Sequence, residues 1–365
     1  MGKVSLVRTK GNLKQELQQA LTLIGGLDTY VHPGDKVMLK PNLNGLEGYT
    51  RRELVASLIE LLFDHKVKDI FLAEATFGSP HMTDMFFKKT GFLDLAKNYG
   101  LRMINLNRSE PVEIEVANPL ALKKMKIARE ALEADKIINL PNMKVHYATG
   151  ITLALKNMKG ILVGDEKRHF HEVGLEKAIV DLNNTIKPCL NIVDCIQCME
   201  RMGPRGGDMV DLELIMAGQD SGEVDYIGSR IMQYDLSEVR HVAWYIAVNN
   251  IDLSQIEVYG EKLEEVRYPF RKVVLEDVIP DNFSIHNRNA CSSCMNAFLL
   301  SCQLLEEKPH EKVDIYMGEL PDDKAPSGTF TIGFGNCCSG DILCHQRIKG
   351  CPPYPFALNE VLKKR

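Results

Sequence analysis

The chain has 365 residues, 45% hydrophobic and 25% charged, and its 44 Lys and Arg residues against 49 Asp and Glu residues give a formal net charge of −5. This is the composition of a globular protein with room for a large apolar core and more than one domain. The basic excess that nucleic-acid phosphates require is absent, so no nucleic-acid partner is expected. There is no signal-like amino terminus and no apolar run of bilayer length, so we expect a cytoplasmic protein without a membrane partner.

Short apolar runs rich in β-branched residues alternate with stretches of helical periodicity through the first two thirds of the chain. The apolar spacing at 53–65 and 174–186 predicts helices. Strand–helix alternation favours an α/β fold with a largely parallel sheet and flanking helices, because parallel neighbours need a crossover connection. The predicted strands cover residues 4–9, 36–40, 69–75, 102–106, 136–141 and 189–194.

A second region begins near residue 265. Residues 267–289 contain two prolines and no helical period, which indicates a connector. We therefore predict an α/β domain over 1–264 and a small cysteine-bearing α/β module over 265–365. The predicted elements of this module are a helix within 291–307, strands at 312–320 and 328–337, and a closing helix at 356–364.

The ten cysteines are unevenly distributed, with three in mid-chain and seven in the last 75 residues. In a cytosolic chain such clustering indicates metal binding or redox work rather than disulfides. The mid-chain pair Cys195 and Cys198 follows a strand end, as redox pairs do, although two small buried residues would give the same pattern.

The carboxyl-terminal cysteines have the spacing of a cluster site. A CxxC pair brings two thiolates to one metal or cluster, and cysteines from separate turns complete a four-thiolate set. The glycines close to Cys337 and Cys351 allow close approach of the backbone. The predicted ligands of an iron–sulfur cluster are Cys291, Cys294, Cys337 and Cys351.

Other interpretations of these cysteines stay open. Zinc also takes four cysteines, but structural zinc sites usually show two close pairs, and buried or disulfide-bonded cysteines are a third interpretation. Cys337 is preferred to the adjacent Cys338 only because it directly follows the predicted strand and glycine turn. Cys302 lies on the predicted helix and is assigned to the core, whereas Cys344 fits either role.

The segment GCPPYP around Cys351 resembles the GCPP-x-P segment of the small subunits of nickel–iron hydrogenases and of the related complex I subunit. In those proteins this cysteine binds a 4Fe–4S cluster together with an upstream cysteine pair and one glycine-flanked cysteine. The resemblance covers the tail of the chain and implies a 4Fe–4S cluster as the cofactor.

Polar side chains that bind anions or move protons are concentrated in loops after the predicted strands, where open α/β sheets build their sites. Lysine and asparagine hold carboxylates or phosphates, and histidine moves protons, although such residues in loops are often simply solvated. No Walker loop or G-x-G-x-x-G motif supports nucleotide binding. The substrate-binding candidates are Lys40, Asn42, Lys144, Thr149 and Asn157, and the catalytic candidates are His146, Lys156, His171 and Asp194.

The same loops carry a second resemblance. LKPNLN at 39–44, the run at 134–160 that ends in ALKNMKG, His171, the segment at 191–207, and GQDSGEVDYIG at 218–228 resemble the domain of unknown function family numbered 362. Members of that family often carry iron–sulfur cysteines. The chain departs from the family at Cys195, where glycine is usual, and in lacking two ferredoxin-type CxxCxxC runs. The resemblance implies a domain but no substrate.

Three functions are compatible with these features. The first is a redox protein whose cluster exchanges electrons with a small-molecule substrate in the larger domain and with a ferredoxin-type electron partner. The second is a cluster-containing isomerase or dehydratase that uses histidine and lysine proton chemistry, and the third is a non-catalytic cluster or electron carrier. Proteins of this size commonly form symmetric dimers, so a homodimer is expected.

Overall fold

The structure is a computed structural model that describes residues 2–307, 309–318, 329–338 and 344–364. The chain divides into two compact units, Met1–Lys272 and Val273–Arg365, which we call the larger unit and the C-terminal unit. This division lies after the residue-264 boundary expected from sequence. The intervening segment belongs to the larger unit, because Arg271 Nε lies 2.6 Å from Glu200 Oε1 and its Nη2 lies 2.6 Å from Asp208 Oδ2.

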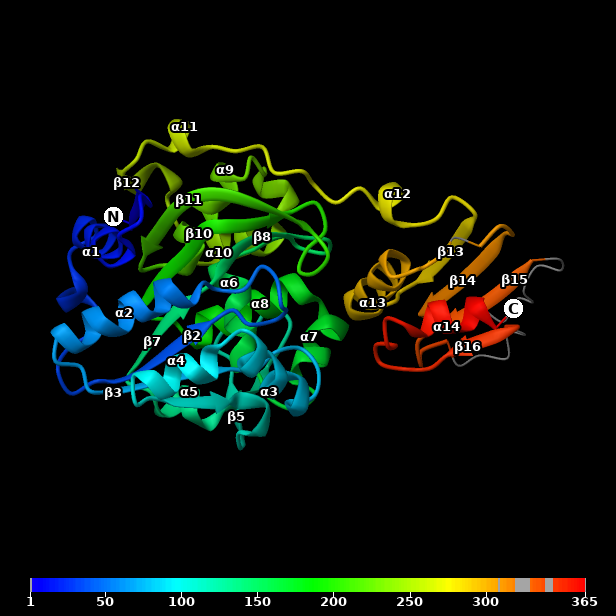
Figure 1. The fold of residues 1–365 in the computed structure, drawn as a ribbon, viewed down its shortest axis with the longest axis horizontal. Helices are drawn as coiled ribbons and strands as arrows, with labels where there is room; N and C mark the ends of the chain where they lie inside the picture. Colours follow the sequence, from blue (N-terminus) through cyan, green and yellow to red (C-terminus); the bar gives the residue numbers. More distant parts are fainter. Residues whose placement is uncertain (1, 308, 319–328, 339–343, 365) are drawn as a thin grey trace. The chain divides into compact units, whose positions relative to one another are not determined.

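The larger unit is built on a mostly parallel sheet (Figure 1). Within residues 2–272, all of which the structure describes, the strand order is β12-β1-β11-β10-β7-β2-β3-β4, with the β8–β9 hairpin joined to β10. Strand β11 runs antiparallel to both β1 and β10. The strands are β1 (Gly2–Arg8), β2 (Lys36–Pro41), β3 (Asp69–Glu74), β4 (Arg102–Asn105), β7 (Lys136–Leu140), β8 (Asn142–His146), β9 (Gly150–Thr152), β10 (Leu190–Glu200), β11 (Asp208–Gly218) and β12 (Ile256–Gly260), with β5 (Pro111–Glu115) and β6 (Lys124–Ala128) forming a separate antiparallel pair.

Helices cover both faces of this sheet. Val37 and Leu39 of β2 enter one core cluster with α1, α2 and α4, whereas Lys40 lies at an alternate position that faces the other side. Helix α9 covers that second side, because its Gly228 packs against Met216 of β11. The helices are α1 (Leu13–Leu23), α2 (Arg52–Asp64), α3 (Pro80–Lys89), α4 (Phe92–Asn98), α5 (Arg129–Glu133), α6 (Ala154–Asn157), α7 (Glu166–Val173), α8 (Leu175–Thr185), α9 (Ser221–Ile231), α10 (Arg240–Val248) and α11 (Leu263–Val266), with 3-10 turns η1 (Leu27–Thr29), η2 (Leu106–Arg108), η3 (Met158–Ile161), η4 (Leu236–Glu238) and η5 (Leu253–Gln255).

The C-terminal unit has a parallel sheet and an apolar core of its own. In its described part the strand order is β13-β14-β15-β16. Phe298, Ile315 and Phe334 are fully buried in its core. The elements are α12 (Leu275–Val278), β13 (Phe283–Arg288), α13 (Ser292–Gln303), β14 (Val313–Gly318), β15 (Phe330–Phe334), β16 (Gln346–Ile348) and α14 (Ala357–Lys363); the remaining parts of the predicted strands, at 319–320 and 328, lie outside the described residues.

The predicted fold class is confirmed, since a largely parallel sheet with flanking helices precedes a small α/β module that carries cysteines. The prediction of a plain connector over 267–289 is wrong at β13, which is the edge strand of the small sheet. Only Phe283 of that strand is buried, so its sequence lacks the apolar run of a central strand. No helix in the described part of the chain is long and apolar enough to cross a membrane.

Candidate functional site

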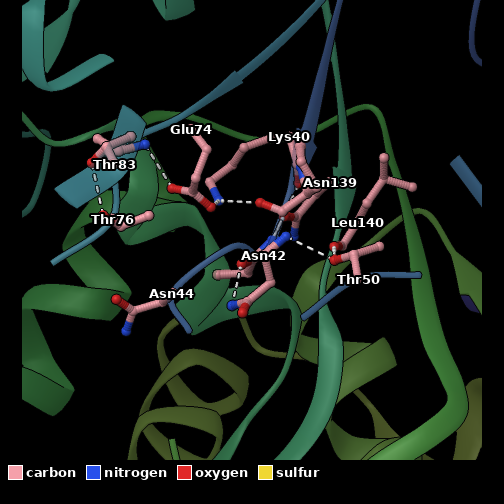
Figure 2. Close-up of polar contacts among 12 residues, drawn as sticks. Lys40, Asn42, Asn44, Thr50, Glu74, Thr76, Thr83, Asn139 and Leu140 are labelled. Atoms are coloured by element: carbon pink, nitrogen blue, oxygen red, sulfur yellow. Dashed lines mark hydrogen bonds and ion pairs between the residues drawn. The ribbon is translucent and has the colours of Figure 1, made fainter. Parts of the chain in front are cut away.

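A buried ion pair stands at the carboxyl ends of β2 and β3 (Figure 2). Lys40 Nζ lies 2.8 Å from Glu74 Oε2, and the two side chains are 0% and 4% exposed. Burial lowers the pKa of Lys40, and the carboxylate of Glu74 opposes that shift. A Cβ atom on Gly160 would lie 1.8 Å from Glu74 Oε1, so only glycine lets the η3 turn pass beside the pair.

A chain of asparagine side chains continues from this pair into the sheet. Asn157 Oδ1 accepts a hydrogen bond from Asn42 Nδ2 at 2.9 Å, and Asn157 Nδ2 donates to Asn139 Oδ1 at 2.8 Å. Asn139 in turn donates to Asn191 Oδ1 at 2.8 Å. Asn157 Nδ2 also lies 3.3 Å from the carbonyl of Lys40. Because each amide has buried partners, this chain fixes the loops that follow the strands.

Lys144 on β8 reaches the same place from the hairpin side. Its ammonium donates to Asn42 Oδ1 at 2.8 Å and to the carbonyl oxygen of Gly48. The residue is 1% exposed, and burial followed by the charge of Arg205 lowers its pKa to about 7. The structure therefore brings Lys40, Asn42, Lys144 and Asn157 together as the sequence predicted, although their role as ligand-binding residues stays a prediction.

The short α6–η3 segment supplies two further lysines. Asp225 of α9 anchors the segment, since its carboxylate accepts from the backbone amides of Ala154 at 2.6 Å and Leu155 at 3.0 Å. Lys156 Nζ has Thr152 Oγ1 at 3.4 Å. The pKa of Lys156 is lowered well below its usual value by burial and by the charges of Lys159 and Lys144.

Lys159 and His171 form a close nitrogen pair. Lys159 Nζ lies 3.1 Å from His171 Nε2, and both side chains are partly exposed. Burial, followed by the charge of Lys167, lowers the pKa of Lys159 to about 7. Burial, Lys159 and Lys156 likewise lower the pKa of His171 well below its usual range. A neutral imidazole at this position can accept a hydrogen bond from the ammonium beside it.

His146 is held in one tautomer by the turn that follows β8. Its Nδ1 accepts hydrogen bonds from the amides of Ala148 at 3.0 Å and Thr149 at 3.3 Å. Burial and the charge of Lys156 lower its pKa, so the ring is neutral and carries its proton on Nε2. Thr149 serves this same turn, with its hydroxyl donating to the carbonyl of Ile151 at 3.0 Å.

Asp194 on β10 binds backbone amides. Its Oδ2 accepts from the amide of Arg51 at 2.6 Å and its Oδ1 from the amide of Ile196 at 3.0 Å. Burial raises its pKa to about 6 although these hydrogen bonds oppose the shift. Asp194 is a catalytic candidate from sequence, and in the structure its carboxylate holds the backbone at Arg51, which immediately precedes α2.

Sequence reasoning missed four residues that belong to this site. Lys159 lies three residues after Lys156, and Lys167 lies four residues before His171. Both spacings place side chains on one face of a helix, so they could have indicated these two lysines. Lys167 Nζ lies 3.0 Å from Asn107 Oδ1. The other two missed residues are Glu74 and Arg205; Arg205 Nε donates to the carbonyl of Asn44 at 3.1 Å.

The four predicted cluster ligands of the C-terminal unit also meet. The Cys294 thiol is hydrogen-bonded with Cys291, and this bond, burial, and the negative charges of Cys291, Cys351 and Cys337 raise its pKa. Cys294 is buried near the start of α13, whereas Cys337 and Cys351 are exposed on the loops after β15 and β16. Four thiols from three segments therefore lie within electrostatic range of one another, after the carboxyl ends of β13, β15 and β16.

The adjacent residues Cys337 and Cys338 have different surroundings. Cys338 is 3% exposed, its thiol donates to the carbonyl of Tyr316 at 2.9 Å, and burial raises its pKa to about 11. Cys302 is 7% exposed within the apolar core of the C-terminal unit. Both thiols are placed as packing residues, which leaves Cys337 as the residue of its pair that acts on Cys294.

The mid-chain cysteine pair belongs to the core of the larger unit. Cys195 and Cys198 lie on β10, fully buried, and burial raises the pKa of each thiol well above its usual value. Within the described part of the chain, no group of three or more His, Cys, Asp or Glu side chains is arranged to hold a metal ion. That finding concerns a single ion; a cubane cluster separates its thiolate ligands by its own iron and sulfide atoms.

The larger unit is thus an open α/β sheet with a cationic polar site at the carboxyl ends of its strands. The family model described as "Domain of unknown function (DUF362)" matches residues 37–230, more than half of the chain, so the protein belongs to this family. The resemblance inferred from the sequence of the larger domain is confirmed by this match. The match ends before the carboxyl-terminal cysteines.

Two known proteins are similar to parts of the chain. The thylakoid-associated protein sll1697 of Synechocystis sp. is 29% identical over 255 residues, covering 66% of this chain and 77% of that protein. The lactate racemase apoprotein from Thermoanaerobacterium thermosaccharolyticum superposes with a TM-score of 0.42 and 14% identity, covering 62% of this chain and 57% of that chain.

The buried ion pair generates a stability prediction. Replacing Lys40 by Met leaves the Glu74 carboxylate buried without its cation, and we expect the free energy of unfolding in urea to fall by about 3–5 kcal/mol. Lys36→Met on the same strand is the control, because Lys36 and Glu133 form a partly exposed pair at 3.5 Å whose loss costs at most about 1 kcal/mol. Equal losses in the two variants would contradict a dominant role for the buried pair.

Proposed function

We propose that this protein is an iron–sulfur redox protein. In this proposal the C-terminal unit holds a 4Fe–4S cluster, and the larger unit binds the small molecule that is oxidised or reduced. The observation that carries the proposal is the position of the Cys294 thiol, which interacts with Cys291, Cys337 and Cys351 although these residues come from three separate segments. Four thiols that converge in this way are the donor set of a cubane cluster.

The backbone around these thiols supports the same assignment. Gly335 has a φ of +103°, and a Cβ atom there would lie only 3.1 Å from Cys294 Sγ, so glycine lets the loop approach the thiol. The amide of Asn336 donates to the carbonyl of Gly350 at 3.0 Å, and the amide of Gly350 donates to Asn336 Oδ1 at 2.8 Å. These two bonds tie the Cys337 loop to the Cys351 loop.

A bound cluster would supply single-electron transfer. Exposure of Cys337 and Cys351 would give a ferredoxin-type electron partner access to that end of the C-terminal unit. In the larger unit, Lys144 and Lys156 would bind the substrate, held in place by Asn42 and by the Asp225 anchor.

Proton transfer in the larger unit is assigned to His171. It is partly exposed and its Nε2 is 3.1 Å from the Lys159 ammonium, which can return a proton to it. His146 is the more buried of the two predicted histidines, and two backbone amides occupy its Nδ1. His146 is therefore a positioning residue in this proposal.

The test is iron and acid-labile sulfide per chain in protein purified without oxygen, with an EPR spectrum after dithionite. We expect about four irons and four sulfides and a signal on reduction. Cys294→Ala and Cys337→Ala should lose most of the iron and sulfide, because each removes a ligand.

Cys302→Ala and Cys338→Ala are the matched controls, one on the same helix and one beside Cys337, and both should keep the cluster. Circular dichroism and thermal unfolding of the four variants would show that the C-terminal unit is folded in each. Zinc without sulfide in the wild type, or cluster loss in Cys338→Ala but not in Cys337→Ala, would overturn the assignment.

A further inference from the structure

The site at the carboxyl ends of the strands gathers more lysines than the neighbouring carboxylates pair with. Lys40, Lys144 and Lys167 are 0%, 1% and 7% exposed, and Lys156 and Lys159 are partly exposed beside them. The lysines lie within electrostatic range of one another, since Lys144 and Lys159 both act on Lys156, and Lys167 acts on Lys159. We call Lys144, Lys156, Lys159 and Lys167 the lysine cluster.

The acidic groups nearby are committed elsewhere. Glu74 forms its ion pair with Lys40, and Asp194 binds two backbone amides. These are the carboxylates that act on Lys144, while Arg205 adds a further positive charge to it.

The hydrogen bonds of the lysine cluster go to neutral partners. Lys144 donates to an amide oxygen and a carbonyl, and Lys156 has a threonine hydroxyl. The Lys159 ammonium lies beside the His171 imidazole, and the Lys167 ammonium donates to the side-chain amide oxygen of Asn107. Ammonium groups that are buried without counter-charges are costly, so a fold keeps them when something else supplies the negative charge.

We propose that the lysine cluster, together with Arg205, binds a compact polyanion that carries at least two negative charges on phosphate or carboxylate groups. This inference names the substrate class for the larger unit and rests on the proposed function only in calling the ligand a substrate. The anion binding itself requires no cluster in the C-terminal unit.

The surroundings fit this class of ligand. Glu74 is paired with Lys40, and the other carboxylate that acts on Lys144, Asp194, already binds two backbone amides, so a singly charged anion would not neutralise the four lysines and Arg205. Lysine provides point charges and arginine a planar fork, and both groups suit phosphate and carboxylate oxygens. Asn42 is a positioning residue in this arrangement, because its Oδ1 holds the Lys144 ammonium.

Isothermal titration calorimetry on the full chain tests the proposal with three probes at matched ionic strength: pyrophosphate, citrate and chloride. We expect saturable one-to-one binding of pyrophosphate or citrate and none of chloride. The probe that binds more tightly shows whether the site prefers phosphate or carboxylate groups. Lys159→Met and Lys167→Met should each weaken binding by about tenfold or more, whereas Lys123→Met, which changes an exposed lysine of the same unit, should not.

The pH dependence of anion binding distinguishes lysines that contact the anion from lysines that only stabilise the fold. Burial lowers the pKa of Lys144, Lys159 and Lys167 to about 7, and a bound anion would raise these values, so binding should take up protons. Affinity should then fall as the pH rises from about 7 to 9. Besides one another, the lysines have seven charged or titratable groups near them: Lys40, Glu74, Asp194, Arg205, His146, His171 and His241.

Two results would overturn the inference: no saturable binding of either polyanion at millimolar concentration, or equal affinity in wild type, Lys159→Met and Lys167→Met. Lys159 and Lys167 have neutral hydrogen-bond partners, so replacing either leaves no buried carboxylate without its cation, and thermal unfolding checks that each variant is folded. The same titration on Cys294→Ala separates the two proposals. In Cys294→Ala, both proposals together predict lost iron and retained binding of the polyanion. Wild-type protein that lacks iron and sulfide but binds pyrophosphate contradicts the proposed redox function alone, and iron-loaded wild-type protein that binds neither polyanion contradicts this inference alone.

Discussion

The larger unit depends on the burial of ammonium groups at the carboxyl end of its sheet. The first of them, Lys40, is compensated within the chain by Glu74 at 2.8 Å. That pair requires glycine at 160, and the turn that Gly160 permits places Asn157 and Lys159. The asparagine chain then fixes Asn42, whose side chain holds Lys144. The Lys40–Glu74 ion pair thus helps to position the lysine cluster, whose hydrogen bonds go to neutral partners.

This arrangement follows from the fold. Parallel strands β2, β3 and β7 end at one edge of the sheet, so the residues at their ends meet in space although they are far apart in the chain. The segment carrying Lys156 and Asn157 reaches that edge because Asp225 of α9 accepts hydrogen bonds from its first backbone amides. The C-terminal unit repeats the principle on a smaller parallel sheet, whose loops after β15 and β16 carry Cys337 and Cys351.

The sequence was sufficient where the candidate residues lie at or just after strand ends. Apolar runs located the parallel strands, and the polar residues just after them, Lys40, Asn42 and Lys144, do meet in the structure. The sequence was insufficient where the role of a side chain depends on its burial in the folded protein. Lys159 and Lys167 resemble solvated helix lysines until the fold surrounds them, and the capping geometry of Asp194 depends on Arg51, a residue 143 positions away. The surroundings of Cys337 and Cys338 differ for the same reason, since only packing separates two adjacent thiols.

We infer that the buried lysines of the larger unit take their counter-charge from a bound anion. NMR of protein labelled with 13C at lysine Cε measures this directly, because the Cε shift follows the charge of each ammonium. We expect Lys144, Lys159 and Lys167 to titrate near pH 7 in the free protein. With saturating pyrophosphate or citrate, the same lysines should titrate at distinctly higher pH. If every lysine titrated near about 10.4 and none responded to either polyanion, the claim would be contradicted.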